Sequence, residues 1–452
     1  MNASRLALWI PIALAAVGCR QAPPGDRPLN VLLVVVDSLR RDHLGCYGYE
    51  RATSPNVDRF ARDATLFTGA TSQASWTTPA MGALLSSQYP TTLGIHSTLS
   101  ALPDEAVLLS EVLESRGYAT GAVVSHSFCS SQCNFHQGFQ EFDESNVLGH
   151  DAVSSPGVTD RALEFLQRRQ GGPFFLWVHY FDPHFGYVEH SEWPFTTAPG
   201  YDGPVKSGMT YEELWSRRRS LKPDDVDQIV RFYDSEIAFT DLQIGRLLDG
   251  LRALGLNERT LVVFTADHGE EFMDHAGLFH GKTLYSEVVR VPLIARIPGL
   301  APGVVDRPVA SVDLFPTILD ALAIDAPGPI AGRSLLRPTV ESGEAGLRPV
   351  FSELDTTRGA ALRSVVMGGL KLVRDLKSDA RQVFDLAADP GETKNLAATV
   401  GGDAALARKV AALDRALGAW IDETGRHAFG ASEVDIGDEE RKRLEELGYG
   451  DR

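Results

Sequence analysis

A run of hydroxyl side chains stands directly before a predicted helix within residues 75–96. Pro79 suits the first helical turn, and Thr77 or Thr78 suits the cap. Residues 81–87 are small and apolar residues that continue the helix. Backbone N–H groups and the helix dipole favour an anion at a helix N-terminus, so a hydroxyl there is well placed to attack a sulfate or phosphate ester. The same residues also fit an ordinary threonine cap.

Polar residues follow three apolar runs that have the composition of buried parallel strands. Asp37 follows the first run, residues 31–36, the pair Asp267-His268 follows another, and a histidine and aspartate cluster at 179–184 follows a third. Because sites collect beyond the carboxyl ends of strands in open α/β sheets, these side chains are expected to meet. Two carboxylates and an imidazole suit a divalent metal ion. Asp37, taken alone, could equally be a helix cap.

Strand and helix patterns alternate along most of the chain, which predicts an α/β fold with a large, mostly parallel sheet between helices. A long helix is expected at 223–254, after an irregular surface excursion at 190–225. A Pro- and Gly-rich stretch at 327–344 marks a boundary. Beyond it, a Gly-Gly turn joins two short strands at 362–367 and 370–374, and a final amphipathic helix follows, so a smaller second unit is predicted.

The composition is that of a soluble globular protein, with 43% hydrophobic and 23% charged residues. The formal net charge of −17 and the absence of a basic block in the sequence argue against a nucleic-acid partner. An anionic small molecule, glycan or lipid remains a fitting substrate, because a metal ion and a few cations can reverse the potential inside one cleft.

The first nineteen residues have the pattern of a signal peptide, with Arg5 before an apolar run that ends at Gly18-Cys19. The segment resembles a bacterial lipobox, so we expect export and a lipid anchor to the membrane surface through Cys19, with simple secretion as the alternative. In an oxidising compartment Cys129 and Cys133 are close enough in sequence for a small disulfide, and Cys46 is expected to be a buried, unpaired thiol.

With these residues in view, the chain resembles the sulfatase family of the alkaline phosphatase superfamily over about residues 29–450. The resemblance implies an alkaline-phosphatase-like catalytic domain and a C-terminal α+β subdomain with an antiparallel sheet. The motifs are Val-Val-Val-Asp37-Ser-Leu-Arg40, the segment from Pro79 to Pro90, Thr-Ala-Asp267-His268-Gly-Glu, His280-Gly-Lys282-Thr-Leu-Tyr285, and Val383-Phe384-Asp385 running on to Asn395-Leu. The expected organisation is a signal peptide and lipobox at 1–19, a tether at 20–28, the catalytic domain at 29–340, the subdomain at 345–425 and a charged tail at 426–452.

The chain departs from the family pattern at its most characteristic motif. Sulfatases place a Cys or Ser, converted to formylglycine, in a Cys-x-Pro-x-Arg motif, whereas this chain has Thr77 there and Met81 at the arginine position. Threonine cannot become formylglycine, so the stretch resembles the Thr-nucleophile branches of the superfamily. Ser38 stands where the family has a second aspartate, which removes one expected metal ligand.

The resemblance implies roles for individual side chains. Asp37, Asp267 and His268 would hold one divalent ion, Ca²⁺, Mn²⁺, Zn²⁺ or Mg²⁺, with the Thr77 hydroxyl as a fourth contact. His280 and His184 are the candidates for protonating the leaving group. The candidates for contacting the anionic substrate are Lys282, His126 and Arg40. Lys282 is also predicted to be a catalytic residue.

Two other features of the 179–184 cluster are expected to be structural. His179 is interpreted as a hydrogen-bonded histidine at a strand end, and Asp182-Pro183 as a turn. A second metal ion held by Asp182, His184 and His280 is conceivable but not expected.

The leading hypothesis is a metal-dependent hydrolase that cleaves a sulfate, phosphate or phosphonate ester through Thr77. One alternative is a transferase that moves a phospho-headgroup at the membrane surface. Another is an inactive protein that uses the same cleft to bind an anionic glycan. The sequence predicts no oligomeric state.

Overall fold

The computed structural model describes residues 28–148, 153–169, 171–193, 195–336, 348–355 and 361–434. The predicted signal peptide, Cys19 and the tether up to residue 27 lie outside these residues, as does most of the charged tail. Within the described ranges, no helix combines the length and apolar character needed to cross a bilayer.

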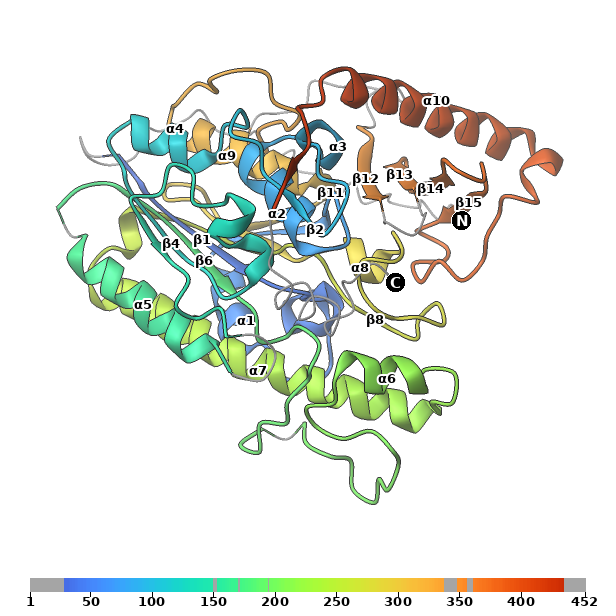
Figure 1. Ribbon diagram of the computed structural model, residues 1–452, viewed down its shortest axis with the longest axis horizontal. Coiled ribbons are helices and arrows are strands. Elements are labelled where there is room, and N and C mark those ends of the chain that lie inside the picture. The colour runs from blue at the N-terminus through green and yellow to red at the C-terminus, as the bar shows by residue number, and fades with distance from the viewer. Residues whose placement is uncertain are drawn as a thin grey trace, which may run out of the picture.

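A large mixed sheet of eight described strands forms the centre of the molecule (Figure 1). Its strand order is β11-β2-β10-β7-β1-β6-β4-β5, and β10 alone runs antiparallel to both neighbours. The predicted α/β class with a mostly parallel sheet is confirmed. The strands are β1 (Asn30–Val36), β2 (Thr65–Thr71), β4 (Ala119–Val123), β5 (Glu141–Asp143), β6 (Phe174–Tyr180), β7 (Thr260–Ala266), β10 (Leu293–Arg296) and β11 (Gly303–Ala310).

The register of the three central strands decides where the site lies. Val36 at the end of β1 is level with Tyr180 of β6 on one side and Ala266 of β7 on the other. The next residues along β1 and β7, Asp37 and Asp267, therefore leave the sheet side by side at its carboxyl edge. All three strands are buried along their whole length, as their apolar composition predicts.

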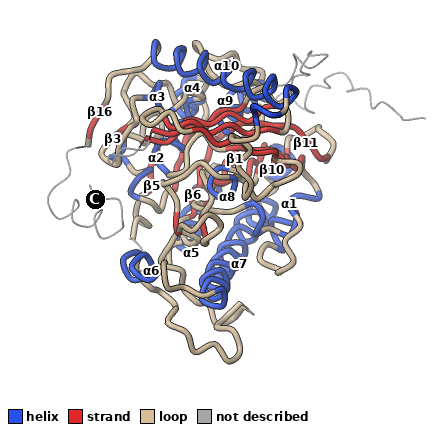
Figure 2. Tube along the Cα trace, turned by 90° about the vertical axis from the view of Figure 1, so that its right-hand side faces the viewer, coloured by secondary structure: helices blue, strands red, loops and turns tan. Residues whose placement is uncertain are grey.

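Helices cover both faces of this sheet. In Figure 2 the strands form a layer, with α3, α4 and α9 above it and α5 and α7 below it. The predicted long helix is confirmed as α7, and its buried positions pack against α5 and α1. The helices are α1 (Pro55–Arg62), α2 (Thr77–Ser86), α3 (Pro90–Leu93), α4 (Leu109–Ser115), α5 (Ser155–Arg168), α6 (Tyr211–Arg217), α7 (Pro223–Ala253), α8 (Ser286–Val289) and α9 (Leu314–Ala321).

A four-stranded antiparallel sheet and helix α10 (Ala404–Arg426) form the C-terminal unit. Its order is β12-β13-β14-β15, and the predicted hairpin is present, with Gly368 and Gly369 both in the left-handed region at its turn. After α10, a short strand pairs with another near α3 on the main body. The strands are β12 (Val350–Asp355), β13 (Ala361–Met367), β14 (Leu370–Asp375), β15 (Arg381–Asp385), and the pair β3 (Ser100–Ala101) with β16 (Ser432–Glu433).

Some sequence-based expectations are wrong. The excursion at 190–225 is not wholly irregular, because Thr210 and Glu213 form a capping box that starts α6. Cys129 and Cys133 do not form a disulfide: both are buried free thiols within a pair of short 3-10 turns. Cys46 is free as expected, but it is only half-buried.

Candidate active site

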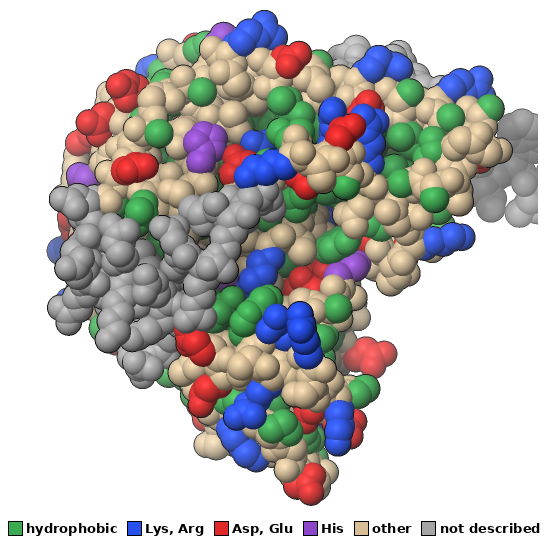
Figure 3. Space-filling view, turned by 45° about the vertical axis from the view of Figure 1, so that its right-hand side comes forward, with side chains coloured by type: hydrophobic (Ala, Val, Ile, Leu, Met, Phe, Trp, Pro, Cys, Tyr) green, Lys and Arg blue, Asp and Glu red, His purple; other side chains and the backbone are tan. Residues whose placement is uncertain are grey.

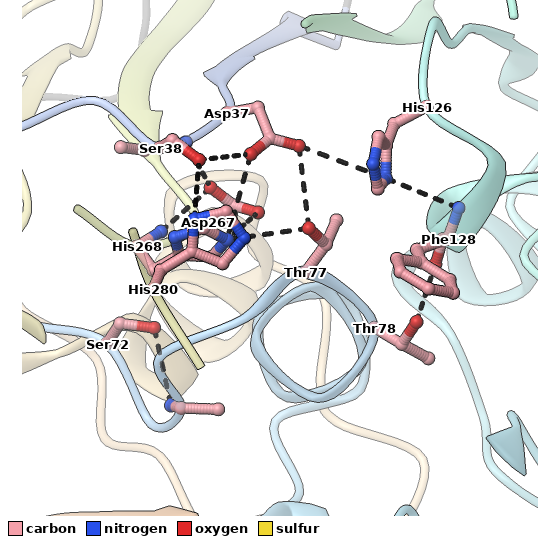
Figure 4. Close-up of polar contacts among 12 residues, drawn as sticks. Asp37, Ser38, Ser72, Thr77, Thr78, His126, Phe128, Asp267, His268 and His280 are labelled. Carbon is pink, nitrogen blue, oxygen red and sulfur yellow. Dashed lines mark hydrogen bonds and ion pairs between the residues drawn. The ribbon is translucent and has the colours of Figure 1, made fainter. Parts of the chain in front are cut away.

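Thr77 is the first residue of α2, and its hydroxyl does not cap that helix (Figure 4). Its Oγ1 lies 3.5 Å from Asp37 Oδ2 and 3.4 Å from His268 Nε2. The neighbouring Thr78 donates instead to the carbonyl of Phe128, at 2.9 Å. The interpretation of Thr77 or Thr78 as an ordinary helix cap is therefore wrong, and the Thr77 hydroxyl, fully buried, faces the carboxylates at the sheet edge.

Three candidate metal ligands meet beside that hydroxyl. The donor atoms of Asp37, Asp267 and His268 all lie within 4.8 Å of one another. His268 Nε2 is 3.3 Å from Asp267 Oδ2 and 3.7 Å from Asp37 Oδ1, separations too long for strong hydrogen bonds. They are close to the spacing of about 3.4 Å between neighbouring ligands of a tetrahedral ion with bonds near 2.1 Å.

The orientation of the His268 ring suits metal binding. Its Nδ1 lies 2.9 Å from the carbonyl oxygen of Gly269, which can only accept, so Nδ1 carries the proton. Nε2 is then the nitrogen with a lone pair, and it faces the two carboxylates. A backbone contact that fixes the tautomer in this way is typical of a metal-binding histidine.

The electrostatics of Asp37 and Asp267 also indicate a metal site. Burial raises the pKa of Asp37 well above its usual range, and the charges of Asp267 and Glu270 raise it further. Burial likewise raises the pKa of Asp267, whose Oδ2 receives no hydrogen bond from the described residues. Two buried carboxyl groups with such incomplete solvation need a cation to stabilise their charged forms. The residues therefore fit one divalent ion.

Ser38 occupies the position of the missing family aspartate and is held in the left-handed region, with φ at 53°. Its backbone N–H donates to Asp267 Oδ1 at 3.2 Å, and its hydroxyl donates to Asp37 Oδ1 at 2.8 Å. A conformation that costs energy for a residue with a side chain is thus kept at the point where both carboxylates are oriented. Ser38 positions the candidate ligands.

The three histidines predicted from the sequence gather around these acids. His280 stacks obliquely on His268, with ring centroids 4.3 Å apart, and lies 4.8 Å from the ring of His184. His126 Nδ1 is 4.0 Å from Asp37 Oδ2, and its ring lies 5.2 Å from that of His184. These rings form a continuous wall beside Thr77.

A buried carboxyl group supports this wall. Glu270 Oε1 contacts His280 Nδ1 at 3.1 Å, and its Oε2 accepts a hydrogen bond from the Tyr187 hydroxyl at 3.0 Å. Burial raises the pKa of Glu270 to about 8. Glu270 was not singled out from the sequence, although it belongs to the Asp-His-Gly-Glu segment that carries the resemblance.

The two predicted cationic contacts have different surroundings. Lys282 is half-buried near Glu270, and burial lowers its pKa to about 8. Arg40 is buried and donates to Asp42, Asp274 and the Glu270 carbonyl. Its donors serve these internal contacts, and a role for Arg40 in substrate binding stays a prediction.

The prediction that His179 is a hydrogen-bonded histidine at a strand end is wrong. Its side chain is fully buried, yet neither ring nitrogen has a hydrogen-bond partner in the described part of the chain. Its Nε2 lies 3.8 Å from Asp37 Oδ2, and burial lowers its pKa to about 3. Asp182, in contrast, accepts three hydrogen bonds from Ser154 and Ser155 at the start of α5.

Comparison with known proteins agrees with this fold. The sulfatase family model matches residues 29–324, and the model of the C-terminal part of N-sulphoglucosamine sulphohydrolase matches residues 274–414. The chain is 29% identical to human arylsulfatase A over 464 aligned positions, which cover 83% of this chain and 85% of that enzyme.

Two solved structures share the fold. A phosphonate monoester hydrolase from Silicibacter pomeroyi aligns with a TM-score of 0.72 and 20% identity, covering 90% of this chain and 99% of that one. A 2-O GAG sulfatase aligns with a TM-score of 0.71 and 19% identity, covering 90% and 95%. From its catalytic core to its C-terminal unit, the chain belongs to the sulfatase family of ester hydrolases.

Proposed function

We propose that this sulfatase-family hydrolase cleaves a sulfate, phosphate or phosphonate ester with Thr77 as its nucleophile. The observation that carries the proposal is the direction of the Thr77 hydroxyl, which faces Asp37 and His268 from the start of α2 instead of capping the helix. A hydroxyl in this place, beside candidate metal ligands and a wall of histidines, has the arrangement needed for covalent catalysis.

Asp37, Asp267 and His268 would hold the divalent ion, which would lower the pKa of a nearby hydroxyl and neutralise the charge of the ester oxygens. Thr77 donates its hydroxyl proton toward Asp37 Oδ2 and forms a bond to the sulfur or phosphorus atom. The bond from that atom to the alcohol oxygen then breaks, and the oxygen takes a proton from His280 or His184.

The covalent ester on Thr77 must be resolved by a second displacement. A formylglycine hydrate can expel sulfate by returning to its aldehyde, whereas a threonine ester has no such route. Water must attack the sulfur or phosphorus atom and release the Thr77 oxygen, with a histidine taking the water proton. Displacement at phosphorus assisted by a metal ion is familiar chemistry, so this requirement favours phosphate and phosphonate esters.

The relatives support an anionic glycan as the alcohol part of the substrate, because the 2-O GAG sulfatase and an N-acetylglucosamine-6-O-sulfatase of Bacteroides thetaiotaomicron are named for such substrates. A protein that only binds such a glycan would not need Thr77, Asp267 and His268 in this arrangement. Hydrolysis is therefore the function that the site supports best.

We predict that hydrolysis requires a divalent ion. Protein from residue 25 onward, stripped with a chelator, is assayed with p-nitrophenyl sulfate, p-nitrophenyl phosphate, a bis-p-nitrophenyl phosphate diester and a phenylphosphonate ester. Activity on at least one ester should return with Mn²⁺, Zn²⁺, Ca²⁺ or Mg²⁺, and the same ion should raise the melting temperature. Asp267→Asn should lose the melting-temperature rise.

Three results of these measurements would contradict the proposal. Full activity after removal of the metal would exclude the suggested role of Asp37, Asp267 and His268. A lack of hydrolysis of every ester, with tight metal binding retained, would favour a binding protein. An equal rise in melting temperature for Asp267→Asn would place the ion elsewhere.

We also propose that the protein is exported and anchored by a lipid on Cys19, on the basis of the signal-peptide and lipobox pattern. In a bacterial host, the full chain should fractionate with membranes and label with a radioactive fatty acid, whereas Cys19→Ala should lose the label. Labelling of both proteins would refute an anchor at Cys19, and export without any label would indicate simple secretion.

A further inference from the structure

Helix α6 lies against the loop that carries His280. The ring of Tyr211 is 4.7 Å from that of Phe279, the residue directly before His280, and 5.6 Å from that of Phe185. Trp215, one turn further along α6, stacks on Tyr211 with ring centroids 5.9 Å apart. One layer of aromatic rings therefore separates the half-exposed face of Trp215 from the catalytic histidines.

Two cations lie against the same indole ring. Lys282 Nζ is 4.5 Å from the centre of the Trp215 ring, and Arg218 Cζ is 3.9 Å from it. Contacts of this kind are attractive and also fix the position of a flexible cationic side chain. Lys282 therefore lies next to Glu270 in the candidate active site and also next to the end of α6.

Arg218 uses few of its N–H donors in hydrogen bonds to the described residues. A guanidinium group carries five N–H donors, and Arg218 uses one of them to reach the Trp215 carbonyl, at 2.6 Å. Among the described residues, none of the ion pairs involves Arg218, whereas Arg231 and Arg246 on the next helix each pair with a carboxylate. An unpaired, positioned guanidinium is unusual in a chain with a net charge of −17.

The surface has a hollow at this place. Figure 3 shows it between the lower lobe, where α6 lies, and the body above, with Lys and Arg side chains as well as acidic side chains around it. Arg217 and Arg219 flank Arg218 in the sequence and are exposed, so the end of α6 adds further positive charge. These arginines and Lys282 form a local cluster of positive charge, and such a cluster attracts anionic ligands.

We propose that Arg218, positioned on Trp215 next to Lys282, forms a subsite for a second anionic group on the substrate, a sulfate or carboxylate of a glycan. The inference rests on the proposed function, because it assumes that the ester being cleaved occupies the site beside Thr77 and Lys282. The substrate class that follows is a glycan with at least two negative charges, of which one is cleaved and the other is held at the end of α6.

A purely structural role for Arg218 is the competing explanation. Basic residues often follow the last turn of a helix, where they bind free carbonyl groups, as Arg218 does with Trp215. That role would be indifferent to the charge of the ligand. A test must therefore compare ligands that differ in charge. It must also include a control variant that removes another arginine, one that has the same charge but no contact with Trp215.

The test measures binding by calorimetry in a Thr77→Ala background, so that the ligand is not consumed. The probes are p-nitrophenyl sulfate, which has one charge, and sulfated oligosaccharides from heparin, chondroitin sulfate and carrageenan. Arg218→Ala should weaken binding of at least one oligosaccharide about tenfold, as expected for loss of a charge-assisted contact, and should change binding of the single-charge ester less than twofold. The control is Arg219→Ala, which removes the same charge from an exposed position.

Three outcomes would overturn the subsite. These are no binding of any oligosaccharide, equal losses for the ester and the oligosaccharides, and equal losses for Arg218→Ala and Arg219→Ala. Melting temperatures within two degrees of each other would show that the variants are folded. If the chain hydrolyses no ester but keeps Arg218-dependent binding, the proposed reaction fails and the subsite stands.

Discussion

Replacing Thr77 by alanine should reduce kcat/KM for the best ester substrate at least about a thousandfold, as loss of a covalent nucleophile does in other hydrolases. The fold should be unaffected, because the Thr77 hydroxyl does not cap α2, and its hydrogen bonds to described residues are those to Asp37 and His268 in the candidate site. Thr77→Ser keeps the hydroxyl and should retain activity within about tenfold of the wild type.

The measurement should follow the covalent step as well as the rate. Mass spectrometry of acid-quenched enzyme should find the phosphoryl, phosphonyl or sulfuryl group on the peptide that contains Thr77, and none on Thr77→Ala. The matched control is Thr78→Ala, which removes a neighbouring hydroxyl that donates to the Phe128 carbonyl. Hydrolysis by Thr77→Ala at the wild-type rate would refute the mechanism and identify water as the attacking group.

Lys371→Met should destabilise the protein by about 3–5 kcal/mol, the usual result of leaving one member of a buried ion pair alone. Lys371 on β14 is 1% exposed, and its ammonium group donates to both oxygens of Glu392 and to the Leu284 carbonyl. Glu392 also accepts hydrogen bonds from the backbone and hydroxyl of Ser286. The variant would leave the Glu392 charge buried without its cation.

The free energy of unfolding in urea measures this effect, and Arg374→Met on the same strand is the control. Arg374 pairs with the exposed Asp379, so its loss should cost less than about 1 kcal/mol. The double variant Lys371→Met with Glu392→Gln should recover part of the stability, because it removes the unpaired charge. Similar small losses for Lys371→Met and Arg374→Met would show that the buried pair contributes little.

The position of the candidate site could be predicted from the sequence because its residues follow strands with a simple pattern. Asp37 and Asp267 each come directly after a continuous apolar run, and parallel neighbours must bring such positions to one edge. Thr77 could be predicted by its place before Pro79. What the sequence left open was the direction of the hydroxyl, which depends on where the start of α2 lies relative to Asp37 and His268.

Other features could not be predicted because they depend on contacts between distant segments. His179 lies within an apolar strand, and only the pairing with β1 shows that it stands beside Asp37 with no hydrogen-bond partner among the described residues. β2 has the sequence Thr-Leu-Phe-Thr-Gly-Ala-Thr, with too few apolar residues in a row to predict a strand by itself. The pair of Lys371 with Glu392 joins two charged residues that, in the sequence, resemble surface positions.

The excursion that contains α6 leaves the sheet after β6 and returns at the start of α7, so both of its ends are fixed by the core. Changes of length or sequence inside it disturb no strand pairing and cost little loop-closure entropy. The Thr77 hydroxyl, the two aspartates, His268 and His280 lie on other segments, and His184 lies at the start of the excursion, directly after β6. Mutations in this one segment can therefore change which substrate is bound while the reacting groups stay the same. Laboratory evolution of substrate specificity could begin there for the same reason.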